Sequence, residues 1–176
     1  MEGICFLPPT STSDGIPYYY YKNRNYLPSL EDIEQELSEY INKDLPFCTN
    51  GFIDFKDLDV AEGNVETQTR VEDERVIFDV EYPVTITRGE EVSRFRNFDY
   101  IKVISRIGVM YNSIASFIED QMDQGSICLN CMSSIAETEG FEIHMVNAEE
   151  GIVFTFRDEY SLVKGVPIEW RFANKY

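Results

Sequence analysis

One short pattern in this sequence has the residue types and spacing for chemistry: two cysteines three positions apart, Cys128 and Cys131. Thiols at this spacing near the start of a helix can exchange disulfides, because the positive end of the helix dipole favours the thiolate. A redox pair of the thioredoxin type follows a strand in a β-α-β unit, whereas this pair follows a predicted helix and Gly125. We therefore interpret the pair as structural and keep thiol–disulfide exchange as the alternative.

Two further cysteines, Cys5 and Cys48, bring the total to four, which permits three complete pairings. An even number is compatible with disulfides in an oxidising compartment, although four reduced thiols in a cytoplasmic core are also common. We favour disulfides, with Cys48 bonded to one member of the Cys128 and Cys131 pair. Zinc is a poorer match, because the only other ligands of the kind it prefers are Cys5, Cys48 and His144 at scattered positions.

The single histidine, His144, lies in an alternating segment in which Phe141, Ile143 and Met145 should face the core. An exposed, non-catalytic His144 is therefore expected. Without a second histidine a metalloprotease helix cannot be built, and the sequence contains no nucleophile-elbow or phosphate-loop motif. An enzyme that uses two placed carboxylates remains an alternative, because 32 acidic residues could supply them.

The densest group of acidic residues comprises Asp54, Asp57, Asp59 and Glu62. Their oxygen atoms suit calcium, but the group lacks the spacing and the central glycine of an EF-hand loop. We interpret it as a solvated strand end and turn, and we predict neither a metal nor a cofactor for the chain.

The overall charge is strongly negative, because 32 Asp and Glu residues face 15 Lys and Arg residues, a formal net charge of -17. Such a surface repels phosphate backbones and anionic lipid headgroups, which argues against nucleic acid as a partner and favours solubility. The longest apolar runs fall far short of the roughly 20 residues that span a bilayer. The start of the sequence also lacks the pattern of a signal peptide.

The length of 176 residues is typical of one domain. Residues 1–28 hold four of the seven prolines and a run of four tyrosines, which predicts an extended arm before a single acidic domain at residues 29–176. Because successive side chains of a strand point to opposite faces, the arm should leave some rings exposed or in contact with a partner. The candidate interface residues are Tyr18, Tyr19, Tyr20, Tyr21 and Tyr26.

Three helices are predicted from apolar residues at helical spacing. Ser29 and Asp32 can form a capping box at the start of the first helix, which should end near Lys43 because Pro46 disfavours helical geometry in the residue before it. Gly125 is a natural stop for the second helix. The predicted helices are 29–43, 105–125 and 126–139.

The remaining segments alternate between apolar and polar residues and predict strands. The clearest strand contains Val76, Phe78, Val80 and Tyr82, and Pro83 should interrupt it. This order predicts an α+β fold, with about three helices on one face of an antiparallel meander sheet of about eight strands. The predicted strands are 52–58, 65–71, 76–82, 84–87, 92–103, 141–146, 152–157 and 168–172, with loops at 147–151 and 158–167.

Five segments together resemble a group of uncharacterised proteins of small-genome archaea; they are Pro17–Tyr21, Leu27–Glu31, Leu45–Cys48, Ser126–Cys131 and Phe172–Tyr176. In that group a hydrophobic segment, similar to the anchors of archaeal surface proteins and pilins, precedes an acidic domain. The resemblance implies a location outside the cell membrane. It implies no known activity, and it transfers no functional residue.

These features favour a non-catalytic, extracytoplasmic domain that is membrane-anchored at the cell surface or associated with a pilus. It would act by binding a protein partner or by self-assembly, and it would meet the membrane only through an anchor preceding this sequence. The alternatives are a cytoplasmic location and an enzyme that uses paired carboxylates or the redox pair Cys128 and Cys131.

Overall fold

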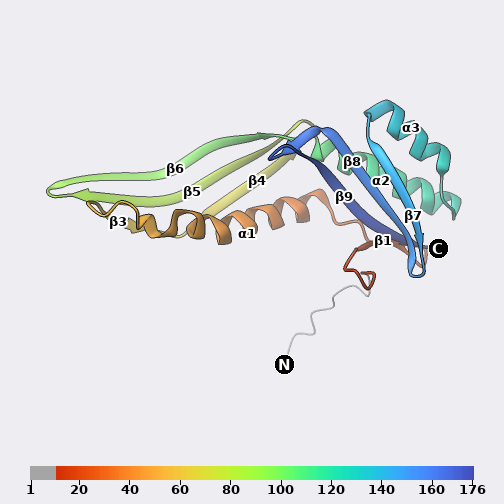
Figure 1. Cartoon of the computed structure of the whole chain (residues 1–176), viewed down its shortest axis with the longest axis horizontal. Coiled ribbons are helices and arrows are strands. Elements are labelled where there is room, and N and C mark those ends of the chain that lie inside the picture. The colour runs from red at the N-terminus through yellow and green to blue at the C-terminus, as the bar shows by residue number, and fades with distance from the viewer. Residues whose placement is uncertain (1–10) are drawn as a thin grey trace, which may run out of the picture. The chain divides into compact units, whose positions relative to one another are not determined.

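The computed structural model of this chain describes residues 11–176, apart from the side chain of Asp99. These residues form three α-helices, a short 3-10 helix and nine strands (Figure 1). They divide into two compact units, residues 11–28 with 105–176 (unit 1) and residues 29–104 (unit 2). The α+β class and the three helices are confirmed. The single meander sheet is wrong, because the strands form two separate sheets.

Unit 1 contains a five-stranded sheet of mixed direction. Strands β7 (Glu142–Ala148), β8 (Gly151–Val163) and β9 (Val166–Lys175) form an antiparallel meander. Strand β1 (Tyr18–Tyr21) lies parallel to β9 and pairs on its other side with β2 (Arg24–Asn25). The parallel pair joins segments from opposite ends of the chain, and a local alternation pattern cannot reveal such a pairing. Strands β1 and β2, which fall within the expected N-terminal arm, are therefore part of this sheet.

The hairpin between β8 and β9 is longer than predicted. Residues 158–167, expected as a loop, extend both strands as far as a tight turn at Lys164 and Gly165. Both turn residues have positive φ angles, 53° and 81°, as two-residue turns of type I′ require. The turn therefore needs a left-handed conformation at Gly165 and at Lys164, and a lysine in this conformation could not be predicted from the sequence.

Helices α2 (Ile107–Gln124) and α3 (Leu129–Glu139) complete unit 1, and each is followed by a left-handed glycine cap at the predicted position. The core of the unit is aromatic. Phe117 of α2 is fully buried, and its ring centroid lies 5.2 Å from that of Phe154 and 6.5 Å from that of Phe172. The rings of β8 and β9 thus hold α2 against the sheet.

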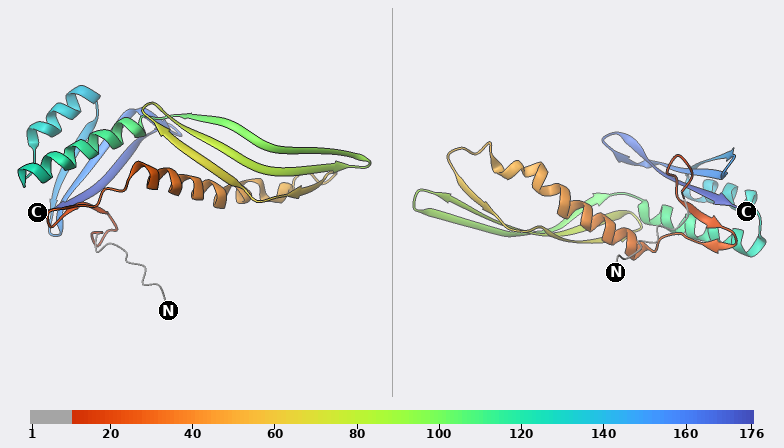
Figure 2. Two further views of the ribbon diagram at one scale, coloured as in Figure 1. Left: turned by 180° about the vertical axis from the view of Figure 1, so that it is seen from behind. Right: turned by 90° about the horizontal axis from the view of Figure 1, so that it is seen from below.

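Unit 2 sets helix α1 (Leu30–Thr49) beside a four-stranded antiparallel sheet (Figure 2). Strand β5 (Arg75–Arg88) is central, and β6 (Glu91–Ile104) pairs along its whole length on one side. On the other side of β5, strands β4 (Glu66–Glu72) and β3 (Asp59–Glu62) follow one another end to end. The apolar cluster of this unit lies between β5 and α1 and includes buried Val80, Tyr82 and Val84.

Strand β5 continues through Pro83, where the sequence predicts a break. No ladder pairing is made at this position, because β4 ends its register at Glu81 and β3 begins at Val84. The register of β6 also shifts between these two residues. The Pro83 carbonyl still accepts a hydrogen bond from the Gly63 N–H at 2.7 Å. Proline is tolerated here because its missing N–H falls at an irregularity of the sheet.

Helix α1 begins as predicted but ends later. Ser29 and Asp32 form the capping box, whereas the helix passes Pro46 and ends at Thr49. The Pro46 carbonyl accepts hydrogen bonds from the Thr49 hydroxyl, at 3.0 Å, and from the Asn50 N–H, and these keep the last turn intact. The following residues 50–58 form a 3-10 helix and turns instead of the predicted strand.

Candidate interaction surface

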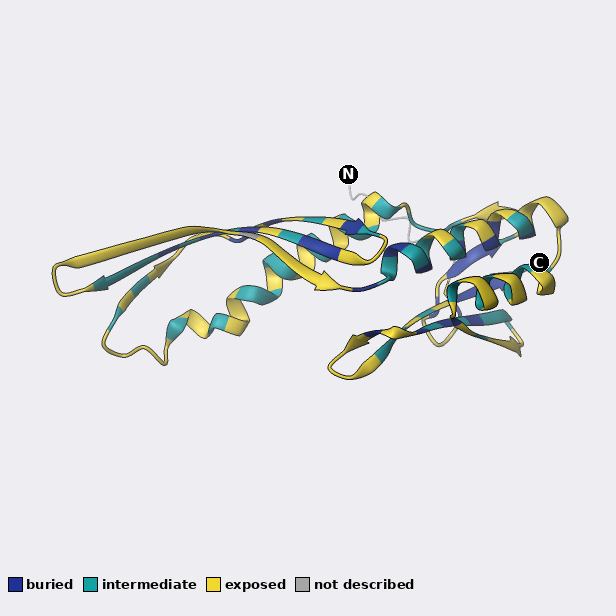
Figure 3. Ribbon diagram, turned by 90° about the horizontal axis from the view of Figure 1, so that it is seen from above, coloured by how far each residue is buried: buried dark blue, intermediate teal, exposed yellow. Residues whose placement is uncertain are grey.

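The most unusual surface of the described residues is strand β6. Every residue with a described side chain in this strand is exposed (Figure 3). Several of its side chains are large and apolar, and four of them, each 43% to 52% exposed, lie opposite the apolar residues Val76, Phe78, Val80 and Val84 of β5. We call these four the β6 row: Phe95, Phe98, Ile101 and Val103.

The β6 row extends the apolar face of the sheet beyond the part that α1 covers. Phe95 lies opposite Val84 and Phe98 lies opposite Val80, and both of these β5 partners are buried in the cluster beneath α1. Residues directly opposite one another in an antiparallel pair point to the same face of the sheet. The row is thus a continuation of the core surface that is left about half exposed.

The opposite edge of the same sheet is protected by α1. Glu34 Oε1 accepts a hydrogen bond from the Val71 N–H at 2.7 Å, and Ser38 Oγ accepts one from the Thr69 N–H at 3.0 Å. Four residues of a helix rise about 6 Å and two residues of a strand rise about 6.7 Å, so one side chain per helical turn meets every second N–H of β4. These hydrogen bonds, which we call the polar seam, provide acceptors for the N–H groups of Val71 and Thr69 at the edge of β4.

The next step of the seam would bring Asn42 of α1 to Thr67 of β4. The Oδ1 atom of Asn42 and the Oγ1 atom of Thr67 are buried, and neither has a hydrogen-bond partner among residues 11–176. Both residues line an open depression of about 340 Å³ whose other walls are mostly acidic or amide side chains. The seam is therefore complete at two positions and incomplete at the third.

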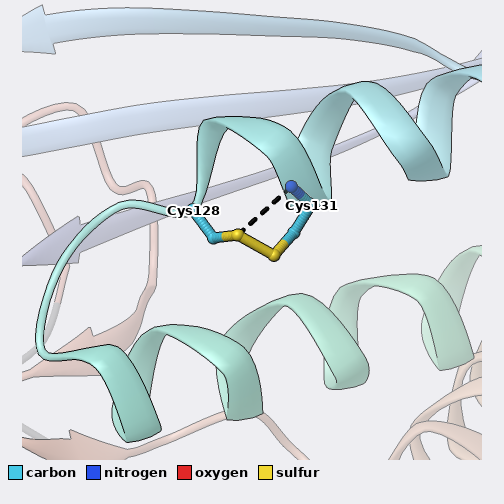
Figure 4. Close-up of a disulfide and its surroundings, with 2 residues drawn as sticks. All are labelled: Cys128 and Cys131. Carbon is cyan, nitrogen blue, oxygen red and sulfur yellow. Dashed lines mark hydrogen bonds between the residues drawn. A yellow bond between two sulfur atoms is a disulfide. The ribbon is translucent and has the colours of Figure 1, made fainter.

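The cysteines differ from the expectation. Cys128 and Cys131 bond to each other, with their Cα atoms 5.2 Å apart at the start of α3 (Figure 4). The predicted bond from Cys48 to this pair is wrong, since Cys48 is exposed on the last turn of α1 and forms no disulfide with a described residue. Cys5 lies outside the described residues. A helical turn brings residues three positions apart together, which explains why the local pairing forms.

The Cys128 sulfur also caps α3. Its Sγ atom accepts a hydrogen bond from the Cys131 N–H at 3.2 Å, so the disulfide and the helix start are one structure. Cys128 is only 8% exposed, and half-buried Cys131 packs against the aromatic core.

His144 and the acidic group are both exposed, as the sequence suggested. His144 lies on edge strand β7, 3.9 Å from a carboxylate oxygen of Glu142. Met145, expected in the core, is exposed as well, and within edge strand β7 only Ile143 is partly buried. No group of three or more His, Cys, Asp or Glu side chains that could hold a metal ion occurs within residues 11–176, the cation candidates Asp54, Asp57, Asp59 and Glu62 included.

The tyrosine run is largely internal. Tyr18 lies opposite Ala173 and Tyr20 lies opposite Asn174, so Tyr19 is an extra residue that forms a β-bulge. The bulge lets Tyr19 and Tyr20 join the same core cluster, while Tyr18 is buried in a smaller one. The premise that consecutive rings must be exposed therefore fails for Tyr18, Tyr19 and Tyr20, whereas Tyr21 and Tyr26 are half-buried.

Unit 1 contains a buried ion pair that the sequence does not predict. The Asp158 side chain is fully buried, and its Oδ1 atom accepts a hydrogen bond from the Arg106 guanidinium at 2.9 Å. Ser161 Oγ donates to the other carboxylate oxygen at 2.6 Å. The guanidinium also lies over the rings of Phe141 and Tyr160, 4.9 Å and 5.4 Å from their centroids. The hydrogen-bond donors and the two rings are all side chains of unit 1, so we assign this ion pair a structural role.

A group of three glutamates surrounds Arg157 on the sheet of unit 1 and bears on the alternative of a paired-carboxylate enzyme. Glu142, Glu159 and Glu169 lie 3.6, 2.8 and 3.9 Å from its guanidinium nitrogens. The arginine neutralises part of their charge, and all three glutamates are about half exposed. This geometry is that of a surface ion-pair network.

No protein-family model, curated protein or solved structure matches this chain. None of the helices in residues 11–176 is both long and apolar enough to cross a bilayer. The β6 row was not predicted from the sequence, because the pattern of residues 92–103 did not show which side chains of the strand face the core. The basic residues Arg94, Arg96 and Lys102, interspersed among the apolar residues of this strand, are the available signal for an edge strand.

Proposed function

We propose that this chain is a non-catalytic binding or assembly domain and that the β6 row is its contact surface. The observation that carries the proposal is the exposure of four large apolar side chains in one row on an edge strand. Burying one such side chain contributes about 1.5–3 kcal/mol, and soluble monomers rarely leave several of them exposed together. Because the four side chains are 43% to 52% exposed, a partner that covers the row would recover roughly half of this free energy for each of them.

The location we propose is extracytoplasmic, in a membrane-anchored archaeal surface or pilus-associated protein. The resemblance of the five sequence segments supports it. The disulfide between Cys128 and Cys131 supports it independently, because disulfides persist mainly in oxidising compartments.

Exposed Cys48 provides a direct test of the compartment. In a Cys5→Ser background, a membrane-impermeant maleimide added to intact native cells should label the protein, and adding Cys48→Ser should abolish the label. If labelling occurs only after the cells are lysed, the cytoplasmic alternative replaces the extracytoplasmic one.

The binding role is tested by a photo-crosslinking amino acid placed at Phe98, with the same group at Phe47 as control. Phe47 is 76% exposed but lies on α1 and outside the row. We expect an adduct in native cells from position 98 and little from position 47. Equal yields at the two positions, or none at either, would contradict a binding role for the row.

Thiol–disulfide exchange is the second candidate, favoured by the hydrogen bond from the Cys131 N–H to Cys128 Sγ. Such a bond would stabilise a Cys128 thiolate after reduction. The low exposure of Cys128 opposes attack by an external thiol, so we assign the disulfide a structural role. Catalysed reduction of a model disulfide by the purified chain, abolished by Cys131→Ser, would reverse this assignment.

A further inference from the structure

The free edge of β6 offers a template for another strand. Among the described residues β6 pairs with β5 alone, so the alternate N–H and C=O groups that face away from β5 have no strand partner there. The strand has 14 residues and is therefore about 45 Å long at roughly 3.3 Å per residue. Natural proteins usually shorten, cover or heavily charge such an edge.

The local charge of β6 differs from that of the rest of the chain. Over the whole chain acidic residues outnumber basic ones by 32 to 15, but β6 itself contains three basic and two acidic residues. A second copy of the chain that approached an average part of the surface would meet like charge. At β6 this repulsion is locally absent.

The charged residues near the two ends of β6 are also opposite in sign. Glu91 lies at one end of the strand and Lys102 lies near the other, and both side chains are exposed. In an antiparallel pair of identical strands, the Glu91 end of each copy adjoins the Lys102 end of the other. A parallel pair would place identical charges side by side.

We propose that two copies of this chain pair their β6 strands antiparallel about a twofold axis near the middle of the strand. This inference rests on the proposed binding role and names the partner. A twofold axis perpendicular to the sheet keeps the same face of both copies on the same side, so Phe95, Phe98 and Ile101 of one copy lie beside those of the other. The interface is closed and self-complementary, which limits assembly through β6 to a dimer.

The first test measures the mass of the purified full chain in solution as a function of concentration. We expect a concentration-dependent dimer for the native chain. Phe98→Lys places like charges near the axis and should weaken dimerisation about a hundredfold or more. Phe47→Lys is the matched control and should dimerise like the native chain. Far-UV circular dichroism of both variants identifies any loss of fold, and a native chain that stays monomeric up to about 1 mM contradicts the proposal.

The second test locates the axis by disulfide trapping, in a Cys5→Ser, Cys48→Ser background. Single cysteines at Arg96, Asn97 or Phe98 should cross-link two copies, since these positions lie near the axis. A cysteine at Val92 should not, because antiparallel pairing separates the two Val92 positions by about 35 Å at roughly 3.3 Å per residue. Equal cross-linking at Val92 and at the central positions would refute antiparallel pairing.

The two proposals fail in different ways. If the purified chain is monomeric and the photo-crosslinker at Phe98 yields an adduct with a different protein in cells, the self-pairing inference is wrong and the binding role stands. If position 98 yields no adduct and the chain is monomeric, both are wrong.

Discussion

Removing the Asp158 carboxylate should destabilise unit 1 more than any change to its surface ion pairs. In Asp158→Ala, the Arg106 guanidinium loses a hydrogen bond of 2.9 Å, and its side chain is only 20% exposed to water. Ser161 Oγ and the Tyr160 N–H lose their acceptor at the same time. Breaking one side of a buried ion pair costs about 3–5 kcal/mol. We expect about 3 kcal/mol, since part of the guanidinium can still reach water.

The neighbouring Arg157 network provides a matched control on the same strand. Glu159 lies 2.8 Å from the Arg157 guanidinium, a closer contact than that of Arg106 with Asp158, but its side chain is 48% exposed. Exposed ion pairs contribute about 0–1 kcal/mol, because water and salt screen them. Glu159→Gln should therefore cost less than about 1 kcal/mol.

Urea unfolding monitored by tryptophan fluorescence measures both effects. Trp170 is the only tryptophan of the chain and lies on β9, so its signal reports unit 1. For a slope near roughly 2 kcal/mol per molar urea, a loss of about 3 kcal/mol lowers the midpoint by roughly 1.5 M. If Glu159→Gln lowers the midpoint as much as Asp158→Ala, burial does not determine the strength of these ion pairs and the reasoning fails.

Three further predictions concern the seam, α1 and the C-terminus. By circular dichroism during urea unfolding, Ser38→Ala should cost about 1 kcal/mol because it leaves the partly buried Thr69 N–H without its acceptor, whereas Asn42→Ala, which removes an unpaired oxygen, should be neutral within about 0.5 kcal/mol or stabilising. Pro46→Ala should stabilise α1 by about 1–2 kcal/mol, since the gain in helix propensity exceeds the loss of rigidity in the unfolded chain, and a lower urea midpoint would contradict this. Burial raises the pKa of Tyr176 to about 12 from 10.0, so the tyrosine of the unfolded chain ionises at a lower pH than that of the folded chain. Unit 1 should therefore lose stability as the pH rises from 10.0 to about 12. Tyr176→Phe should weaken this decline in the urea midpoint that fluorescence measures.

Local signals predicted the parts of this fold that depend on neighbouring residues. The capping box at Ser29 and the glycine caps at Gly125 and Gly140 are set by a few adjacent residues, and all three occur. Pro46 shows the limit of such rules. The local preference against helix is overridden because the Pro46 carbonyl gains two hydrogen bonds in the last turn.

Long-range pairing could not be predicted in this way. Nothing near Tyr18 in the sequence indicates that it will lie beside Ala173, and the bulge that buries Tyr19 exists only once those two strands have paired. The contact surface shares this difficulty. Phe98 has the same residue type as the buried core phenylalanines, and it is exposed because α1 covers the same face of the sheet over β4 and β5 and not over β6.

The two edges of the unit 2 sheet present the same physical problem and receive different solutions. On β4, Glu34 and Ser38 of α1 accept hydrogen bonds from the N–H groups that would otherwise attract a foreign strand. On β6 no described residue forms such a seam with the outward N–H groups, and the exposed apolar row favours association at that edge. A net charge of -17 opposes indiscriminate contact between copies, which limits association to places where the local charge is balanced. Strand β6 is such a place, so the acidity of the chain and the exposure of Phe98 are compatible: the first suppresses unspecific pairing, and the second drives the specific one.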